Sequence, residues 1–144
     1  MTRALHPIPI GFTLLELMLA LLLLGLLTSV ALPGYRNHWL KAHRAEAVEA
    51  LNTLHLAQEA FRTQQTRYAQ SLTELMASEL SAQQRYRLRV LQASAEGYTL
   101  EAEALGDQVQ DQHCQRFRLV QQQGQVSVYG LGAGQTLSPS CWPQ

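Results

Sequence analysis

Charged residues are scarce in this chain, and their charges cancel. Eleven basic and eleven acidic residues give a formal net charge of zero over 144 residues. The chain as a whole therefore lacks the excess of positive charge that draws proteins to nucleic acid. Long apolar runs are scarce too: the run at residues 12–32 is long enough to cross a bilayer, and no later stretch is apolar enough for a second crossing. About 110 residues follow this run, which is room for one soluble domain.

Cysteine is equally rare, with Cys114 and Cys141 as the two examples. The five histidines do not complete a recognisable zinc spacing with them, so we expect no metal and no cofactor. A bond between the two cysteines would stabilise the domain by roughly 3–4 kcal/mol. It would also imply an oxidising compartment, the periplasm or the cell surface. The alternative is a pair of unrelated buried thiols.

One carboxylate stands at the head of the apolar run. Glu16 lies in the stretch Gly11-Phe12-Thr13-Leu14-Leu15-Glu16-Leu17, after which the sequence stays uncharged to Leu32. From Phe12 to Leu32 a helix would be roughly 30 Å long, the thickness of the hydrocarbon core. A charge inside a bilayer costs roughly 2.5–3.5 kcal/mol on insertion scales, so an intramembrane acid indicates a function and a partner.

This stretch resembles the N-terminal signature of type IV pilins and their pseudopilin relatives. The resemblance implies a leader at residues 1–11, cleavage between Gly11 and Phe12 by prepilin peptidase, and N-methylation of Phe12. It also implies that Glu16 neutralises the amine of a neighbouring subunit during filament assembly. The new amine would lie about 6 Å along the helix axis from Glu16 of its own chain, and opposite charges attract strongly at low dielectric.

Two other interpretations of the N-terminus remain open. It could be an uncleaved signal anchor with Glu16 at the depth of the headgroups. A secretory signal peptide is disfavoured, because its apolar part should span about 7–15 residues and end in an A-x-A-like site. Basic residues on both sides of the run signal orientation poorly, and the positive-inside rule alone would put the C-terminal part in the cytoplasm. The pilin-like motif and the cysteines favour the opposite orientation.

Gly25 and Pro33 are the residues of the apolar run that weaken a helix. In the pilins that the chain resembles, a Gly and a Pro at these offsets bound a segment that loses helix when subunits pack into the filament. Residues 25–33 are therefore a candidate segment for melting. The alternative is a mild kink at Pro33 that is tolerated in lipid.

From Tyr35 to about Phe61 the sequence predicts an amphipathic helix that continues the apolar one. Charged and polar residues are expected mostly on the other faces, Arg44 and Glu46 among them. His55 falls on the apolar face, where a packed and hydrogen-bonded histidine is favoured over a ligand. The predicted apolar stripe, at spacings of three and four, is Leu40, Ala47, Val48, Leu51, Leu54, His55, Gln58 and Phe61.

Past residue 61 the pattern changes from helix to sheet. Ser71 and Glu74 have the spacing of a capping box, which predicts a short turn of helix at Leu72–Ala77. Apolar and polar residues then alternate around Arg85–Val90, Tyr98–Glu103 and Phe117–Leu119, with Val126 and Val128 after a Gln123-Gly124 turn. Such alternation predicts half-buried strands of an antiparallel sheet.

Five arginines fall on these strands, namely Arg85, Arg87, Arg89, Arg116 and Arg118. They could form a surface for nucleic acid or acidic glycan. Glu101 and Glu103 lie on the strand between them in sequence, however, so antiparallel neighbours would place Arg, Glu and Arg side by side. Each such pair contributes about 0.2–1 kcal/mol and fixes the register of the strands. A solvated ladder of ion pairs is therefore favoured, and nucleic acid is a partner that is not favoured.

The C-terminal segment completes the resemblance. The glycine-rich run Gly130–Gly134 is expected to be irregular, and it lacks the Lys-Ser/Thr of a phosphate loop. With Cys114 ahead of it and Cys141 behind, the region is similar to the disulfide-bounded loop of type IVa PilE-like minor pilins. The implied fold is α+β: a long N-terminal helix packed on an antiparallel sheet of about four strands. The implied parts are the leader at 1–11, a transmembrane and assembly helix at 12–34, and a globular head at 35–144.

The function implied is that of a structural subunit of a type IV pilus, a minor pilin rather than an enzyme. It would sit in the inner membrane with one span before assembly and in the extracellular pilus afterwards. Its expected partners are other pilin subunits, prepilin peptidase, the inner-membrane assembly platform and the lipid bilayer. A type II secretion pseudopilin is the alternative, less favoured because of the cysteine pair. A signal-anchored periplasmic binding domain or enzyme is less favoured still, since no catalytic arrangement stands out.

Overall fold

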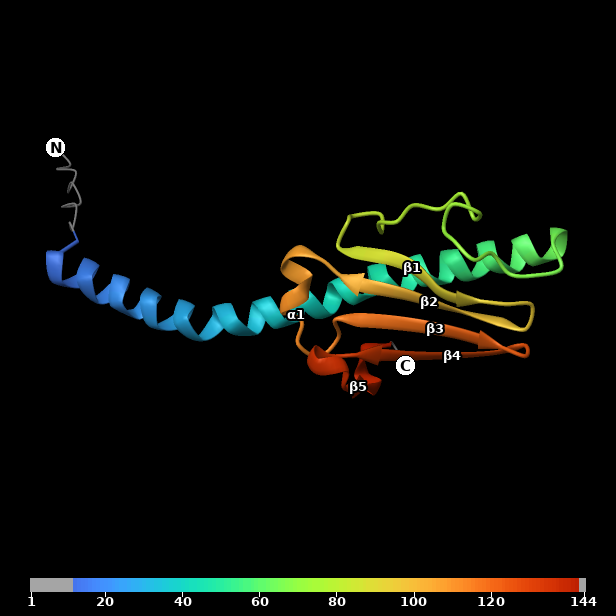
Figure 1. The fold of residues 1–144 in the computed structure, drawn as a ribbon. Helices are drawn as coiled ribbons and strands as arrows, with labels where there is room; N and C mark the ends of the chain where they lie inside the picture. The colour runs from blue at the N-terminus through green and yellow to red at the C-terminus, as the bar shows by residue number, and fades with distance from the viewer. Residues whose placement is uncertain (1–11, 143–144) are drawn as a thin grey trace, which may run out of the picture. The chain divides into compact units, whose positions relative to one another are not determined.

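The computed structural model describes the chain from Phe12 to Trp142, apart from the side chains of residues 30–33. It divides into two compact units, Met1–Arg36 and Asn37–Gln144. The chain is α+β, as predicted, with one long helix followed by an antiparallel sheet (Figure 1). The elements are α1 (Leu14–Gln64), β1 (Tyr86–Ala93), β2 (Gly97–Ala104), η1 (Gly106–Gln110), β3 (Arg116–Gln122), β4 (Gln125–Leu131), η2 (Ala133–Gln135), β5 (Leu137–Ser138) and η3 (Pro139–Cys141).

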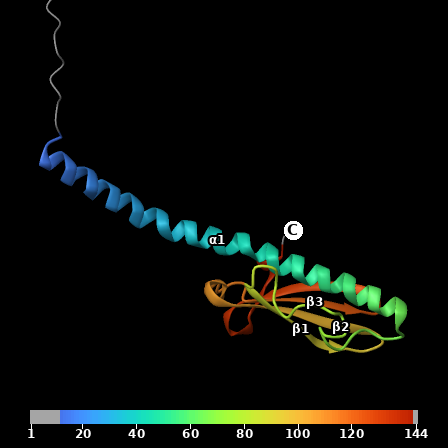
Figure 2. The same cartoon turned by 90° about the horizontal axis from the view of Figure 1, so that it is seen from above.

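Within the second unit, the C-terminal half of α1 lies along one face of the sheet (Figure 2). The predicted stripe is confirmed at its central positions, because Ala47 and Leu51 are fully buried and Leu54 nearly so. The sheet contributes alternate residues to the same core, and the rings of Tyr86 and Phe117 meet edge to face with centroids 5.7 Å apart. The sheet also contributes Leu88, Tyr98, Leu100 and Leu119 to this core cluster.

The sheet has the order β1-β2-β3-β4-β5, and every neighbouring pair is antiparallel. The predicted turn between β3 and β4 is confirmed as a two-residue hairpin. Gln123 and Gly124 both have positive φ, at 51° and 81°. This is the combination that a type I′ turn requires, and its twist matches that of the two strands.

One prediction for the C-terminal region was wrong in part. Gly130 and Leu131 are not irregular but belong to β4, and a fifth strand of two residues pairs with them. Gly130 can lie in the strand because it has no side chain: a Cβ there would collide with the Cβ and Sγ atoms of Cys141. The glycine therefore provides the space that the disulfide fills, which the composition of the run alone does not reveal.

The predicted helix at Leu72–Ala77 is a single hydrogen-bonded turn. The capping bond itself is present, since Ser71 Oγ accepts the N–H of Glu74 at 3.3 Å. Met76 then adopts φ 52°, and the N–H groups of Met76 and Ala77 donate to the carbonyls of Thr73 and Leu72. This left-handed residue and the two hydrogen bonds form a Schellman motif, which ends helices. The helix therefore does not extend beyond one turn.

Candidate functional site

Helix α1 begins with a cap that sequence reasoning overlooked. The N–H of Glu16 donates to Thr13 Oγ1 at 3.2 Å. Thr13 and Glu16 therefore have the spacing and one of the two bonds of a capping box. Glu16 lies in the first turn, where the positive end of the helix dipole favours a negative side chain. Gly11, the residue expected before the cleavage site, lies outside the described residues.

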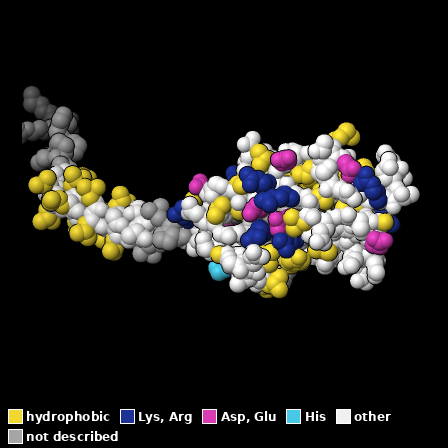
Figure 3. Space-filling model, in the orientation of Figure 1, with side chains coloured by type: hydrophobic (Ala, Val, Ile, Leu, Met, Phe, Trp, Pro, Cys, Tyr) yellow, Lys and Arg dark blue, Asp and Glu magenta, His cyan; other side chains and the backbone are white. Residues whose placement is uncertain are grey.

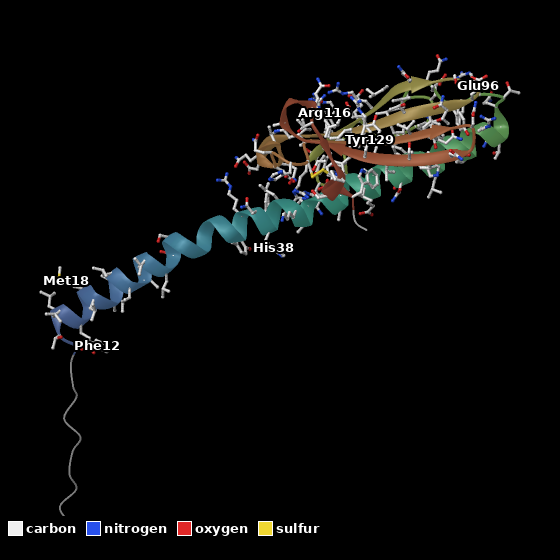
Figure 4. All side chains as sticks on the ribbon, turned by 90° about the horizontal axis from the view of Figure 1, so that it is seen from below. Phe12, Met18, His38, Glu96, Arg116 and Tyr129 are labelled. Atoms are coloured by element: carbon white, nitrogen blue, oxygen red, sulfur yellow. A yellow bond between two sulfur atoms is a disulfide. The ribbon has the colours of Figure 1, made fainter. Side chains whose placement is uncertain are left out.

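The first unit displays its apolar side chains. Among the described residues, α1 is the one helix long and apolar enough to cross a membrane, by length and composition. Its leucines from Leu14 to Leu27 are between 50 and 76 % exposed, and Phe12 is 79 % exposed. Figure 4 labels Phe12, which precedes α1, and Met18, which lies near the start of the helix with its side chain pointing away from the helix axis. Such continuous exposure is characteristic of a surface that lipid or other helices cover.

The segment around Gly25 and Pro33 is helical in this structure. The hydroxyl of Thr28 lies 3.0 Å from the carbonyls of both Leu24 and Gly25, and Ser29 Oγ donates to Leu26 O at 2.7 Å. Side-chain bonds of this kind compete with the backbone ladder and weaken it slightly. Pro33 supplies no N–H to the carbonyl of Ser29, four residues earlier. The proposed melting of residues 25–33 is not tested by these contacts and stays a prediction.

The outer face of the sheet, on the side away from α1, carries the predicted ladder of charges. The register aligns Arg87, Glu103 and Arg116 in one row. The next row contains Arg89, Glu101, Arg118 and Tyr129. Figure 3 shows basic and acidic side chains side by side over these strands, and Figure 4 labels Arg116 and Tyr129 on them. The expectation of neighbouring Arg, Glu and Arg rows is confirmed.

Two of the four ladder arginines are neutralised. Arg118 Nε donates to Glu101 Oε2 at 2.7 Å, and Arg89 pairs with Glu103. Partial burial opposes the charge on Arg118, but the bonds to Glu101 and Tyr129 outweigh it and raise the pKa of Arg118. Across the part of the chain that the structure describes, Arg87 and Arg116 form no ion pair with an acidic side chain. The outer face therefore has a local excess of positive charge that the net charge of zero conceals.

Arg85 does not belong to this ladder, contrary to the prediction. Its guanidinium donates to Glu46 Oε2 at 2.9 Å, across to α1. Glu46 also accepts bonds from Ser81 Oγ and from the N–H of Gln83. Partial burial disfavours the ionised form of Glu46, but these hydrogen bonds prevail and lower the pKa of its carboxyl.

The disulfide between Cys114 and Cys141 is confirmed, with Cα atoms 5.5 Å apart and a separation of 27 in sequence. Beside it lies an ion pair that was missed. Arg44 donates through Nε and Nη2 to the two carboxylate oxygens of Asp111, at 2.7 and 2.9 Å, and through Nη1 to Ser140 O at 3.2 Å. Arg44 was expected on the polar side of α1, yet it is 9 % exposed. Its spacing of four from Leu40 and three from Ala47 was the available signal.

His55 is packed and hydrogen-bonded, as predicted. Its Nδ1 atom bonds to the hydroxyl of Tyr98, which in turn donates to Glu59 Oε1 at 3.2 Å. Burial, followed by the negative charge of Glu59, raises the pKa of the Tyr98 phenol. Within residues 12–142, no three His, Cys, Asp or Glu side chains converge as a metal site. The histidine is therefore part of the packing between helix and sheet.

Three features together define a pilin-like protein. They are a long helix with an exposed apolar N-terminal half, an antiparallel sheet packed on its C-terminal half, and a C-terminal segment bounded by a disulfide. Comparison with known families agrees with this class. Residues 33–118 match the model of the family described as type IV minor pilin ComP, DNA uptake sequence receptor. Because the match covers more than half of the chain, the protein belongs to this family of type IV pilins. The family is one of structural pilins and is not an enzyme family.

A curated relative supports the same assignment. The chain is 32 % identical over 65 residues to the type IV major pilin protein PilA of Myxococcus xanthus (strain DK1622). The alignment covers 45 % of this chain and 30 % of that protein, so the chain spans less than a third of the relative it matches. The resemblance to type IV pilins is thereby confirmed.

Proposed function

We propose that this protein is a minor subunit of a type IV pilus that is processed before Phe12 and assembled through α1. Prepilin peptidase would remove residues 1–11 and N-methylate Phe12. Before assembly, the single span at residues 12–34 would anchor the subunit in the inner membrane. The head, residues 35–144, would lie in the periplasm. The assembly platform would then transfer it to the extracellular pilus.

The observation that carries this proposal is a carboxylate in the first turn of an uncovered apolar helix. Glu16 stands there, and the leucines around it are exposed. An isolated charge in lipid is unfavourable, whereas a carboxylate beside an ammonium group at low dielectric is strongly attracted to it. A free amine at Phe12 of a neighbouring subunit would supply that partner when the helices pack together.

Helix α1 would adapt to the filament at residues 25–33. The backbone hydrogen bonds of α1 in this segment lack the N–H of Pro33. They are also weakened by the bonds that the hydroxyls of Thr28 and Ser29 make to backbone carbonyls. Gly25 adds backbone freedom at the other end of the segment. Melting between Gly25 and Pro33 would thus cost less than elsewhere in the helix.

Assembly is tested by substituting Glu16. Glu16→Ala should leave the protein in the membrane but remove it from sheared filaments, because the amine of Phe12 loses its counter-charge. Glu49→Ala is the matched control, since Glu49 is an exposed acid on the same helix. Immunoblots of membrane and filament fractions measure the distribution, and mass spectrometry of the filaments identifies the N-terminus. Normal incorporation of Glu16→Ala, or an intact Met1 in filaments, would contradict the proposal.

A second role, in DNA reception, is favoured by a specific observation. Arg87 and Arg116 flank Glu103 on an open sheet face and have no acidic partner among residues 12–142. Guanidinium groups in this state are suited to phosphate. The description of the matching family names a receptor for a DNA uptake sequence. This supports a DNA-binding role, which the sequence alone did not favour. We propose that the outer face binds the phosphates of duplex DNA.

The alternative function, a type II secretion pseudopilin, has less support from the family match and the structure than it has from the sequence alone. The matching family is one of type IV minor pilins, and the disulfide-bounded C-terminal segment is present. A signal-anchored enzyme has less support as well, because the family is structural. The pilus subunit therefore stands as the principal proposal, with DNA binding as a property of its head.

A further inference from the structure

A hollow lies between α1 and the segment after η1, and neither the proposed assembly nor the proposed DNA binding uses it. Its volume is about 240 Å³, roughly eight times the share of one water in the liquid. Residues 110–113 form one wall. The other wall is a single stripe of α1, whose members follow at spacings of three and four: Asn37, Leu40, Lys41 and Arg44.

The two walls of the hollow are tied to each other and to the rest of the head. Asp111 accepts two bonds from Arg44. Just before this wall, Gln108 Nε2 donates to Leu40 O at 3.0 Å. Just after it, Cys114 is held in the disulfide. The shape of the hollow is therefore set before a ligand enters, which lowers the cost of ordering on binding.

The hollow offers positive charge and no free carboxylate. Lys41 is the single lysine of the chain, is exposed, and forms no ion pair among the described residues. Asp111 is the one acid among the described lining residues, and Arg44 occupies both of its oxygens. The exposed side chains of Asn37 and His113 add N–H donors. An ammonium group beside neutral donors is suited to a phosphate group.

The place of this stripe along the chain corresponds to the depth of lipid headgroups. Asn37 comes three residues after Gly34, the end of the proposed span, which is about 5 Å along a helix. The headgroup layer on one side of a bilayer is about 5–8 Å thick. Side chains on a helix lean toward its N-terminus, so Lys41 reaches back toward this layer. Tyr35 and Trp39 lie in the same stretch, and both residue types are enriched at the membrane interface.

We propose that this hollow binds the phosphate of an anionic lipid headgroup in the periplasmic leaflet. Lys41 is its ion-pair partner, and Asn37 and His113 donate hydrogen bonds to it. This inference rests on the proposed membrane-anchored state of the subunit. Phosphatidylcholine carries its own cation beside the phosphate, whereas phosphatidylglycerol has a net negative charge that Lys41 can neutralise. The hollow therefore selects anionic lipid, and the subunit must release this lipid when it leaves the membrane for the filament.

The experiment identifies the lipids that stay bound to the protein. Full-length protein is inserted into nanodiscs that contain phosphatidylglycerol and phosphatidylcholine in equal amounts, and native mass spectrometry identifies the retained lipid. The native protein should retain phosphatidylglycerol in preference. Lys41→Met with His113→Ala should lower this preference about fivefold or more, which is the effect of one basic residue beside anionic lipid. Lys41→Arg should keep the preference, because a guanidinium also binds phosphate.

The matched control is Arg36→Met with His38→Ala. It removes a cation and an imidazole from the same stretch of α1, where Figure 4 labels His38, but both positions lie outside the hollow. The control should keep the preference within about twofold, because salt screens charges that make no direct contact. An equal loss in the two variants would mean adsorption by surface charge alone. That result, a loss in Lys41→Arg, or no preference in the native protein would overturn the inference.

Two further measurements separate lipid from free phosphate esters and the hollow from the anchor. An excess of sn-glycerol 3-phosphate should not displace the lipid, because it lacks the acyl chains that lie in the bilayer. Displacement would overturn the assignment of lipid as the occupant. Carbonate extraction of membranes tests the anchor itself: release of the native protein would contradict both the proposed span and this inference. A protein that resists extraction but shows no preference for phosphatidylglycerol would overturn the inference alone.

Discussion

Arg44 on α1 holds Asp111 in a two-pronged ion pair, with N–O distances of 2.7 and 2.9 Å, although 67 positions separate them in sequence. The Arg44 side chain is 10 % exposed and that of Asp111 4 %. Arg44 also donates to Ser140 O, next to the disulfide. One guanidinium thus ties the helix to both the segment after η1 and the end of the chain.

Arg44→Met should destabilise the head by about 3–5 kcal/mol, because Asp111 is left buried and unpaired. Replacing both residues, as Arg44→Met with Asp111→Leu, should recover much of this loss since no buried charge remains. Urea unfolding followed by tryptophan fluorescence measures the change. Arg67→Met serves as the control: it breaks the exposed pair with Glu74 and should cost less than about 1 kcal/mol. Equal losses for Arg44→Met and Arg67→Met would show that the buried pair has no special weight.

Local patterns predicted the parts of the head in which neighbours in space follow from neighbours in sequence. Alternation along β1, β2 and β3 was enough to predict that rows of Arg, Glu and Arg lie side by side on one face, whereas the alignment of Arg87, Glu103 and Arg116 in one row depends on the register that the structure shows. The spacing of three and four was likewise enough to predict the buried face of α1 from Ala47 to Gln58.

The remaining features depend on contacts between distant segments. Arg44 was assigned to the polar face because a charged residue is rarely buried without a partner, and Asp111 could not be recognised as that partner from spacing. Arg85 was assigned to the ladder because it continues the alternation of Arg87 and Arg89. Its actual partner, Glu46, lies on α1, far away in sequence. At the N-terminus, the Thr13 cap could have been found from its spacing to Glu16. The roles of Phe12 and Glu16 in assembly remain predictions.

Gly130→Ala should impair formation of the disulfide. A Cβ at this position would collide with the Cβ and Sγ atoms of Cys141 and lie 3.2 Å from the carbonyl oxygen of Ser138. The backbone of β4 is held by β3 and cannot easily yield, so Cys141 must move away from Cys114. Non-reducing peptide mapping should show free thiols that the native protein lacks.

The control for this substitution is Gly25→Ala, since a Cβ at Gly25 meets no atom within 4 Å. It should leave the disulfide intact. Cys114→Ser with Cys141→Ser gives the scale of the effect, roughly 3–4 kcal/mol of lost stability for a closed loop of this length. Full disulfide formation in Gly130→Ala would mean that β4 can shift to make room.

Stability should fall in acid partly through Glu46. Hydrogen bonds from Ser81, Arg85 and the Gln83 N–H lower the pKa of Glu46 below its ordinary value of 4.5, against the opposing effect of burial. A lowered pKa in the folded state stabilises the fold above the unfolded pKa, and this contribution is lost as the pH falls through the folded pKa. Urea midpoints measured from pH 7 down to pH 3 should therefore decline below about pH 4.5.

Glu46→Gln should reduce the midpoint at pH 7 and flatten its decline below pH 4.5, since no carboxylate remains to be protonated. Glu74→Gln is the comparison. Its hydrogen bonds to Arg67 and the Gln70 N–H lower the pKa of Glu74 to about 2, but the residue lies on the surface. Solvent screening makes such pairs weak, so this variant should change the midpoint less. An unchanged acid profile in Glu46→Gln would remove Glu46 from the explanation.

DNA binding should depend on the two arginines that lack acidic partners. Arg87→Ala with Arg116→Ala should weaken binding to all duplexes alike and reduce the slope of log affinity against log salt by about 2, one for each phosphate contact. Fluorescence anisotropy of a labelled duplex between about 50 and 200 mM NaCl measures this slope. Arg62→Ala with Arg67→Ala removes the same charge outside the sheet and should leave the slope unchanged.

Substitution of Glu103 tests the same face with the opposite sign. Glu103 lies between Arg87 and Arg116 and pairs with Arg89. Glu103→Gln should strengthen binding, because it removes a charge that repels phosphate and frees Arg89 for a further contact. The salt slope should then become steeper by about 1. A weaker affinity in Glu103→Gln, or an equal loss in the Arg62 and Arg67 variant, would contradict phosphate binding at the outer face and leave the ladder as a device that fixes the register of the strands.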